Sequence, residues 1–341
     1  MLSNLIDYSI FYKKKYNNPT ELGDDVAYDL FISAYNDSAR VKEVFEKINA
    51  KQKHWLIFPE YCYAVSEEPK KTADHESIFT FDKNLRESTL IRTYIEKAAI
   101  DLKTIGKVCI DITGFIRPHL VFFVRLLHQM KVNSIDFIYS DPVKYKKKEN
   151  TDFSLDYTHV RQIDGCQGAH STDVNNDFMI IGAGYDHLRI TDVSKNKDNT
   201  KKIQLFGFPS LQPDMYQENI LKAYKAAEET ISKGEEVFID EDNTIFAPAN
   251  DPFVTANIIS QFVKKTNREK EITNLYLCPL STKAQTLGIA LFFVTECLDL
   301  PCSILFPICE RYSKETTEGI SKIWKYVVEF DQLKSPTNGA N

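Results

Sequence analysis

The stretch KVCIDITGFIRPHLVFFVRLLHQMKVNSIDFIY, residues 107–139, carries the pattern that decides the fold. It opens with a short apolar segment at 107–110, which is typical of a buried strand. A polar turn, Asp111–Gly114, then leads into an apolar helix predicted over 118–130, and a further strand is predicted over 134–139. Two strands joined by a helix and short turns predict a parallel sheet with a right-handed crossover.

The same alternation extends in both directions along the chain. Strands are predicted where short apolar runs are bounded by turn residues, at 28–34, 54–58, 177–181, 202–206, 243–247, 275–278 and 302–306. Helices are predicted where apolar residues recur at helical spacing, after 36–38, over about 85–102, over 217–232, after 250–251 and over 286–297. A charged, Asn-rich loop is predicted over 192–201. The fold class is therefore predicted as α/β, with two tandem Rossmann-like halves and mainly parallel sheets.

Three features recur in the same order and indicate an internal duplication. Asn36-Asp37 and Asn250-Asp251 each follow a strand and open a helix. The turns Asp111–Gly114 and Leu280–Lys283 each precede the most apolar helix of their half, and each half ends its next strand with a Pro and a Tyr. Any two strand–helix–strand units share features of this kind. The evidence for a duplication is therefore that all three features occur in the same order in both halves.

These boundaries divide the chain into five predicted parts. They are an N-terminal arm at 1–25, a first Rossmann-like half at 26–150 with an insertion at about 59–90, a connecting segment with additional strands and a helix at 151–235, a second half at 236–334, and a tail at 335–341.

Composition excludes several classes of protein. The 341 residues are 43% hydrophobic, enough for a substantial core, which excludes global disorder. The formal net charge of -6 gives no basic surplus for an extensive nucleic-acid surface. The 7 cysteines are scattered without a CxxC pair, so we expect reduced thiols and neither a disulfide framework nor a metal site. No cofactor is predicted.

No membrane segment or leader is predicted. Asp7 interrupts any apolar stretch before the basic run at 13–15, so no signal peptide is expected. The most apolar stretch, 288–309, is broken by Glu296, Asp299 and Pro301, whereas a spanning helix needs about 20 apolar residues. We therefore expect a cytoplasmic protein.

The candidate binding residues follow the predicted strands, because ligands of open parallel sheets bind beyond the carboxyl ends of the strands. They are Asn36, Asp37, Asp111, Thr113 and Gly114 in the first half, Asn250, Asp251, Ser281, Thr282 and Lys283 in the second, and, as further possibilities, Glu60 and Tyr61.

Two interpretations stay open at these positions. A hydroxyl pair followed by a lysine at a helix start is a plausible anion site, because the helix dipole, the free N–H groups and the ammonium all favour phosphate. A structural helix cap is the commoner explanation for Thr113 and Ser281, whereas Lys283 is equally typical of a solvated helix residue. Gly182-Ala-Gly184 is half of a dinucleotide-binding fingerprint and is more typical of a tight turn. No catalytic residue is assigned.

A strand ending in Asp-x-Thr-Gly before a helix resembles the CARF and SAVED nucleotide-sensing domains of prokaryotic defence systems. The matching residues are Asp111, Thr113 and Gly114 in one half and Ser281, Thr282 and Lys283 in the other. SAVED domains are similar to two fused CARF units, in keeping with the duplication. The resemblance implies a cyclic oligonucleotide messenger bound across the two halves, with Lys283 in contact, and a separate effector subunit. Arg117 and Pro118 interrupt the glycine-rich turn of that group, and the second turn has no glycine.

The predicted function is thus a nucleotide-sensing or binding module that acts with a separate effector in antiviral defence. The alternative is an enzyme acting on a nucleotide or nucleoside. Residues 28–37 resemble the first strand of TIR domains, which implies an NAD-hydrolase class with the Glu60 carboxylate near a glycosidic bond. A third possibility is a non-catalytic partner subunit whose loops serve protein contacts.

Overall fold

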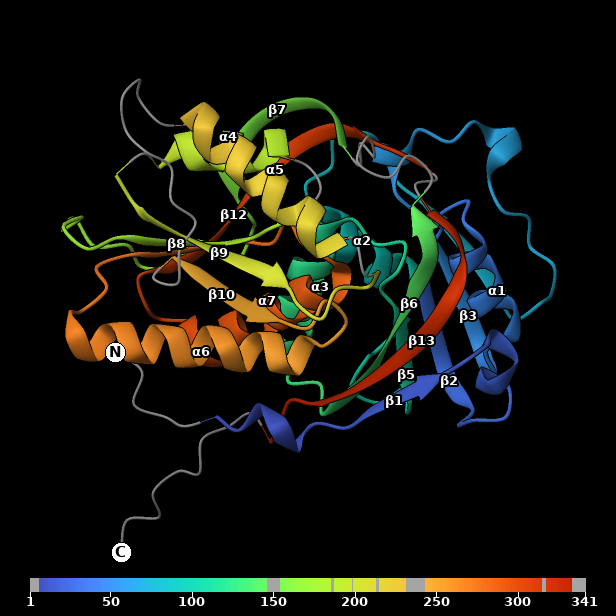
Figure 1. Ribbon diagram of the computed structural model, residues 1–341. Coiled ribbons are helices and arrows are strands. Elements are labelled where there is room, and N and C mark those ends of the chain that lie inside the picture. The colour runs from blue at the N-terminus through green and yellow to red at the C-terminus, as the bar shows by residue number, and fades with distance from the viewer. Residues whose placement is uncertain are drawn as a thin grey trace, which may run out of the picture. The chain divides into compact units, whose positions relative to one another are not determined.

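The computed structural model describes residues 6–145, 154–184, 187–197, 199–212, 215–230, 243–314 and 317–332. Over these residues the chain is an α/β protein with a seven-stranded and a six-stranded sheet, both mostly parallel, which confirms the predicted class (Figure 1). It divides into two compact units. The N-terminal unit consists of Ile10–Asp156 and Cys309–Leu333, and the central unit is built around Tyr157–Ile308.

The sheet of the N-terminal unit has the strand order β1-β13-β6-β5-β2-β3-β4. Strands β2 to β6 are parallel, and β13 is antiparallel to both β6 and β1. The elements are β1 (Lys13–Tyr16), β2 (Tyr28–Ala34), α1 (Ala39–Lys47), β3 (Ala50–Ile57), β4 (Glu76–Thr80), α2 (Glu87–Ala98), β5 (Val108–Asp111), α3 (Arg117–Gln129), β6 (Ser134–Tyr145) and β13 (Thr317–Glu329).

The sheet of the central unit has the order β10-β9-β8-β11-β12-β7, and its strands from β8 to β12 are parallel. Helix α6 packs against α7, and α4 packs against α5. The elements are β7 (Ser154–Gln162), β8 (Phe178–Gly182), α4 (His187–Asn196), β9 (Lys201–Gly207), α5 (Met215–Thr230), β10 (Thr244–Ala247), α6 (Pro252–Glu269), β11 (Leu275–Cys278), α7 (Lys283–Phe292), a π-helical turn (Phe293–Cys297) and β12 (Cys302–Tyr312).

We number the five parallel strands of each unit by their order along the chain. In both sheets, neighbouring strands then follow the spatial order third, second, first, fourth, fifth. This agreement supports the duplication, which stays an interpretation. It also changes one of the correspondences drawn from the sequence. The turns after β5 and β11 do follow strands of equal rank, but Asn36-Asp37 follows a first strand and Asn250-Asp251 follows a third.

The chain passes from one sheet to the other at two places. After β6, it continues into β7 of the central sheet, and after β12 it continues into β13 of the N-terminal sheet. Strand β13 pairs with β6 along its whole length, from Glu329 opposite Ser134 to Thr317 opposite Tyr145 (Figure 1). The N-terminal sheet is therefore completed by β13, which comes from the C-terminal end of the chain.

Several elements differ from the predictions. The polar stretch expected as an insertion contains β4. Because β4 is an edge strand, its five residues include few apolar side chains, and the sequence pattern did not reveal it. Helix α4 overlaps the loop predicted over 192–201. The expected N-terminal arm contributes β1 to the sheet, and Tyr16 is buried. Strand β13 was not predicted, and the predicted tail, 335–341, lies outside the described residues.

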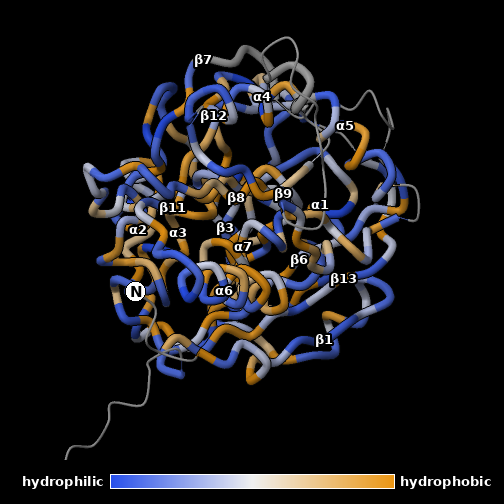
Figure 2. Tube along the Cα trace, turned by 60° about the vertical axis from the view of Figure 1, so that its left-hand side comes forward, coloured by the Kyte–Doolittle hydropathy of each residue, from blue (hydrophilic) through white to orange (hydrophobic). Residues whose placement is uncertain are grey.

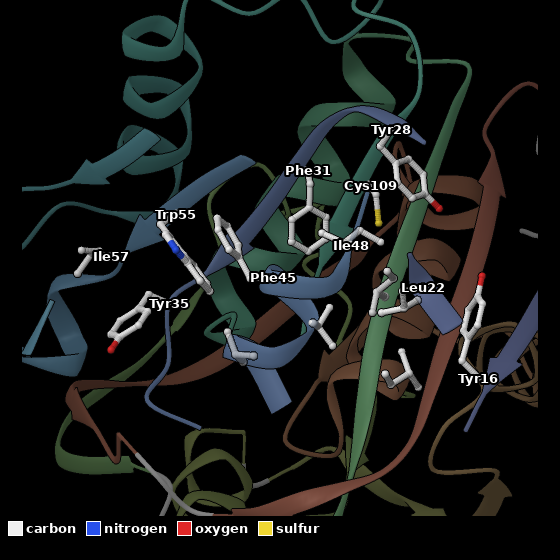
Figure 3. Packing of buried hydrophobic residues seen from close by; sticks show 14 residues of the cluster. Tyr16, Leu22, Tyr28, Phe31, Tyr35, Phe45, Ile48, Trp55, Ile57 and Cys109 are labelled. Atoms are coloured by element: carbon white, nitrogen blue, oxygen red, sulfur yellow. The ribbon is translucent and has the colours of Figure 1, made fainter. Parts of the chain in front are cut away.

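Packing between α1 and the sheet forms the core on one face of the N-terminal unit. The ring of Phe45 on α1 stacks on Trp55 of β3, with centroids 3.6 Å apart and planes at 12° (Figure 3). Phe31 and Cys109, side by side in register on β2 and β5, continue this layer. The face therefore places the start of α1 beside the ends of β2 and β5.

Helices α3 and α7 are the most apolar of their units, as expected, and Figure 2 shows α7 as a largely hydrophobic segment. Every residue of α7 after Lys283 is buried. Across the parts of the chain that the structure describes, no helix is both long and apolar enough to cross a membrane.

Candidate functional site

In the N-terminal unit the order of the strands reverses between β2 and β5, which is where open α/β sheets bind ligands. The loops that follow these two strands are in close contact. A Cβ on Gly114 would lie only 2.0 Å from the carbonyl oxygen of Ala34, so this approach requires a glycine. The Tyr61 hydroxyl, after β3, donates to the Gly114 carbonyl at 2.9 Å. Three strand ends are thereby joined.

The start of α1 lies at this junction, and it has an unusual N-cap. Ser38 occupies the cap position but makes no side-chain capping bond, although serine is a preferred cap. Its hydroxyl is buried, with the residue 2% exposed, and has no hydrogen-bond partner among the described residues. The N-terminus of α1 therefore has a positive dipole end that its own side chain does not neutralise.

Arg40, in the first turn of α1, brings a cation to the same place. Its Nη1 donates to the Ser140 carbonyl on β6, and its Nε donates to the Thr317 hydroxyl on β13 at 3.0 Å. The Ser140 hydroxyl is buried and, within the described ranges, without a partner. These contacts hold the half-buried guanidinium between two strands and beside the open helix start.

The Asp111 carboxylate holds the turn after β5 through hydrogen bonds. The carboxylate accepts from the Thr113 N–H at 2.9 Å and from the Ser33 hydroxyl, on the neighbouring strand, at 3.0 Å. The Thr113 hydroxyl in turn accepts from the Ser140 N–H at 3.1 Å. Burial raises the pKa of Asp111 to about 6, although both hydrogen-bond donors and the charge of Arg40 lower it. Asp111 has no exposed surface, and its hydrogen bonds fix the shape of the turn.

The rim of this junction combines aromatic and basic side chains. The Tyr63 hydroxyl accepts from the Asp37 N–H at 3.0 Å, and the Lys314 ammonium lies 4.9 Å from the centre of the Tyr63 ring. Lys314 also pairs with Glu67 at 2.6 Å, and its carbonyl accepts from the Asn36 side chain. Asn36 is half-buried and Asp37 is exposed. A partly exposed tyrosine with a cation above it is suited to stack on a planar ring.

Glu60 and His119 form a second polar group near the junction. Glu60 follows β3, and His119 stands in the first turn of α3, with its Nε2 2.7 Å from Oε1 of Glu60. Although burial opposes ionisation, the charge of His119 and its hydrogen bond hold the pKa of Glu60 below its usual value. Burial and then the Glu60 charge raise the pKa of neighbouring Tyr61, which Asn36, Arg117 and Arg40 oppose. The pKa values of Glu60 and Tyr61 therefore depend on each other's charge and on nearby groups, including Asn36 and Arg40.

In the central unit the predicted residues serve mainly as helix caps. The Asp251 carboxylate accepts from the N–H groups of Phe253 and Val254 at 3.1 Å each and so caps α6. The Thr282 hydroxyl accepts from Gln285 at 3.2 Å to cap α7, and it donates to the Ala249 carbonyl. These bonds bring the loops after β10 and β11 together. Ser281 is buried, whereas Asn250 and Lys283 are half-buried.

The reversal point of the central sheet lies between β8 and β11, at Gly182-Ala-Gly184. A Cβ on Gly184 would lie 2.3 Å from the Leu280 carbonyl oxygen, and one on Gly182 would lie 2.6 Å from the Ser281 hydroxyl. These two glycines thus permit close contact between two loops. The equivalent contact in the N-terminal unit uses Gly114 on the other loop.

The structure brings the predicted residues together in two groups, one in each unit. Sequence reasoning missed the residues that bring charge and hydrogen bonding to the first group, namely Arg40, His119, Ser140 and Lys314. Arg40 had a recognisable signal, since it stands in the first turn of a helix that follows a predicted strand. Lys314 had none, because it lies in the loop between β12 and β13, far along the chain from the other residues of the junction.

Comparison of the chain with family models, curated proteins and solved structures finds no match.

Proposed function

We propose that this protein binds a small phosphate-bearing ligand, a nucleotide, at the β2–β5 junction of the N-terminal unit. The observation that carries the proposal is the uncapped start of α1, where the Ser38 hydroxyl has no partner among the described residues and Arg40 stands in the first turn. N–H groups, a helix dipole and a guanidinium together are the usual means of binding phosphate.

Two further features support a nucleotide over a simple anion. Tyr63, with Lys314 over its ring, offers a stacking surface for a base at the rim of the same junction. On the strength of the CARF and SAVED resemblance, the ligand is a cyclic oligonucleotide, and the protein acts as a sensor with a separate effector in prokaryotic antiviral defence.

The proposal is tested by a thermal-shift screen of the whole chain against cyclic di-, tri- and tetranucleotides, with NAD and ATP alongside. Ligand at 100 times its Kd stabilises the native state by about 2.7 kcal/mol, which such a screen detects readily. Arg40→Ala and Lys283→Ala form a matched pair, each compared with its own ligand-free Tm. We expect Arg40→Ala to abolish the shift and Lys283→Ala to keep it.

The opposite pattern, with the shift lost only in Lys283→Ala, would place the ligand at the α7 turn, as predicted from the sequence. No shift with any nucleotide would reject the function and direct the search to a protein partner.

The Glu60–His119 pair favours one second candidate, an enzyme that cleaves a nucleotide. A carboxylate kept ionised beside a strand end is suited to general acid–base work or to stabilising a developing positive charge. Incubation of the pure protein with NAD, followed by measurement of released nicotinamide, tests this candidate. Cleavage that is lost in Glu60→Gln would favour the enzyme over the sensor.

A further inference from the structure

The Glu60–His119 pair has two polar atoms that the fold leaves without partners. Oε2 of Glu60 and Nδ1 of His119 are both buried, and neither has a hydrogen-bond partner in the part of the chain that the structure describes. The His119 side chain is 3% exposed and that of Glu60 is 21% exposed. Buried polar atoms without partners are costly, and each calls for a partner that the protein itself does not supply.

The surroundings fix how the pair is presented. His119 stacks on Phe58, with ring centroids 4.5 Å apart and planes at 24°, and Phe58 packs edge-to-face on Phe115. The imidazole therefore has an aromatic support on one side and the Glu60 carboxylate at its Nε2. Oε2 of the carboxylate is an acceptor, and Nδ1 of the imidazole donates or accepts according to the protonation of the ring. The pair offers two polar atoms held in fixed positions.

A carboxylate oxygen is complemented by a hydroxyl donor and not by phosphate, which carries acceptors of its own, and a second hydroxyl can donate to Nδ1 or accept from it. The position along the fold points to hydroxyl groups of a sugar. In doubly wound sheets, an acidic residue about 20 residues beyond the first strand-to-helix turn commonly accepts from a ribose hydroxyl. Glu60 stands at a comparable place, directly after the second strand in rank.

Tyr61 connects this pair to the proposed phosphate site. Its hydroxyl donates to Gly114 in the β5 turn, and the Asn36 side chain hydrogen-bonds to it from the β2 turn. One nucleotide lying across Tyr61 would therefore meet cationic and helix-end groups on one side and the Glu60–His119 pair on the other.

We propose that the Glu60–His119 pair binds the ribose hydroxyl groups of the ligand, so that the N-terminal unit selects ribonucleotides over deoxyribonucleotides. This inference rests on the proposed function, and it adds the class of nucleotide.

The test is isothermal titration of the whole chain with named pairs of probes. ATP and cyclic di-AMP are each compared with the 2′-deoxy counterpart, and inorganic pyrophosphate reports the phosphate site alone. We expect the wild type to bind the ribonucleotide at least about tenfold more tightly, since a site built around a hydroxyl leaves its own polar atoms unpaired with the deoxy analogue.

Glu60→Gln is expected to remove that preference while leaving pyrophosphate affinity unchanged. Glu76→Gln is the matched control, because Glu76 is a buried carboxylate bonded to Thr72 at the start of β4 and lies outside the proposed site. It should keep the full preference. Should Glu60→Gln not fold, Glu60→Asp withdraws the carboxylate by one methylene and should reduce the preference.

The two proposals fail differently. If pyrophosphate and both sugars bind equally well, with no change in Glu60→Gln, the phosphate site stands and the ribose inference is overturned. If neither pyrophosphate nor any nucleotide binds, the proposed function falls and this inference falls with it.

Discussion

In the central unit, α6 and α7 begin with Asp251 and Thr282, whose side chains cap the helices. In the N-terminal unit, α1 begins with Ser38, which has the right residue type for a cap and makes no capping bond. Both units have the same order of parallel strands, but α1 follows the first strand in rank, whereas α6 and α7 follow the third and fourth. The comparison is therefore between two polar strand ends whose side chains cap a helix and one whose serine does not.

The arrangement of charge follows the same division. Arg40 lies at the open start of α1, held by Ser140 and Thr317, and the Glu60–His119 pair lies nearby. In the central unit a comparable carboxylate, Glu296, is fully engaged, with Tyr8 at 2.9 Å, Ser260 at 3.0 Å and Lys264 at 3.0 Å. A satisfied network of this kind specifies packing, whereas unpartnered groups favour a ligand.

The largest expected effect on stability concerns a feature that both units share, a glycine in close contact with a neighbouring loop where the strand order reverses. Gly114→Ala would place a Cβ 2.0 Å from a backbone carbonyl oxygen, and Gly184→Ala would place one at 2.3 Å, so that oxygen must move. We expect each to lower the free energy of unfolding by about 3 kcal/mol, the upper range for overpacking. Urea denaturation measures it, with Gly23→Ala as control, because its Cβ would be 3.3 Å from the nearest atom. A neutral result for either glycine would break the equivalence of the two turns.

The next effect concerns Asp111, which gives the N-terminal turn its own pH dependence. Its pKa is about 6 in the folded protein against 3.8 as the ordinary value, because burial disfavours the charge. The native state therefore binds this proton more tightly than the unfolded state, and stability falls as pH rises from about 4 to about 6.

Asp111→Asn removes this titration and keeps an acceptor for the Thr113 N–H. Relative to the wild type, the variant should gain up to about 3 kcal/mol between pH 4 and 7, at about 1.4 kcal/mol per pKa unit. Denaturation at several pH values measures the difference. Ser33→Ala removes one donor to the carboxylate and should extend the wild-type loss to higher pH; a flat difference between wild type and Asp111→Asn would contradict the assignment.

The α/β class was predictable because buried parallel strands are continuous apolar runs, and residues 107–139 contain two of them around an apolar helix. Strand β13 was not, because Lys322 and Lys325 interrupt its apolar residues and leave no regular alternation. Its partners, β6 and β1, lie far from it in the sequence. A local pattern carries no information about such a pairing.

The candidate site was predictable in part for a similar reason. Strand ends followed by Asn, Asp, Ser or Thr are visible in the sequence, so Asn36 and Thr113 were found. Whether such a residue is a cap or a ligand depends on its hydrogen bonds in three dimensions: Thr282 and Ser38 look alike in sequence, and only the first makes a capping bond. His119, inside an apolar helix, has a role that only its contact with Glu60 reveals.

A smaller effect compares the two helix starts directly. Asp251→Ala removes the carboxylate oxygen that accepts from two backbone N–H groups, and it should cost about 1 kcal/mol, the usual loss for a cap. Ser38→Ala removes a buried hydroxyl that makes no capping bond, so stability should stay the same or rise slightly. Chemical denaturation of the two variants in parallel decides the point. Equal losses would show that Ser38 caps α1 in solution and would close the proposed anion site.

The smallest expected effect is on the exposed pair Asp37–Lys42 at the same open helix start, where Nζ and Oδ1 are 2.7 Å apart. Asp37→Asn should leave stability within experimental error, since exposed ion pairs contribute little. Its carboxylate stands beside the proposed phosphate site, so removing the charge should strengthen pyrophosphate binding by about twofold at low salt, and less as salt screens it. Titration calorimetry at two salt concentrations measures this. Weaker binding instead would mean that Asp37 accepts from the ligand, as predicted from the sequence, and that the open helix start receives donors as well as phosphate.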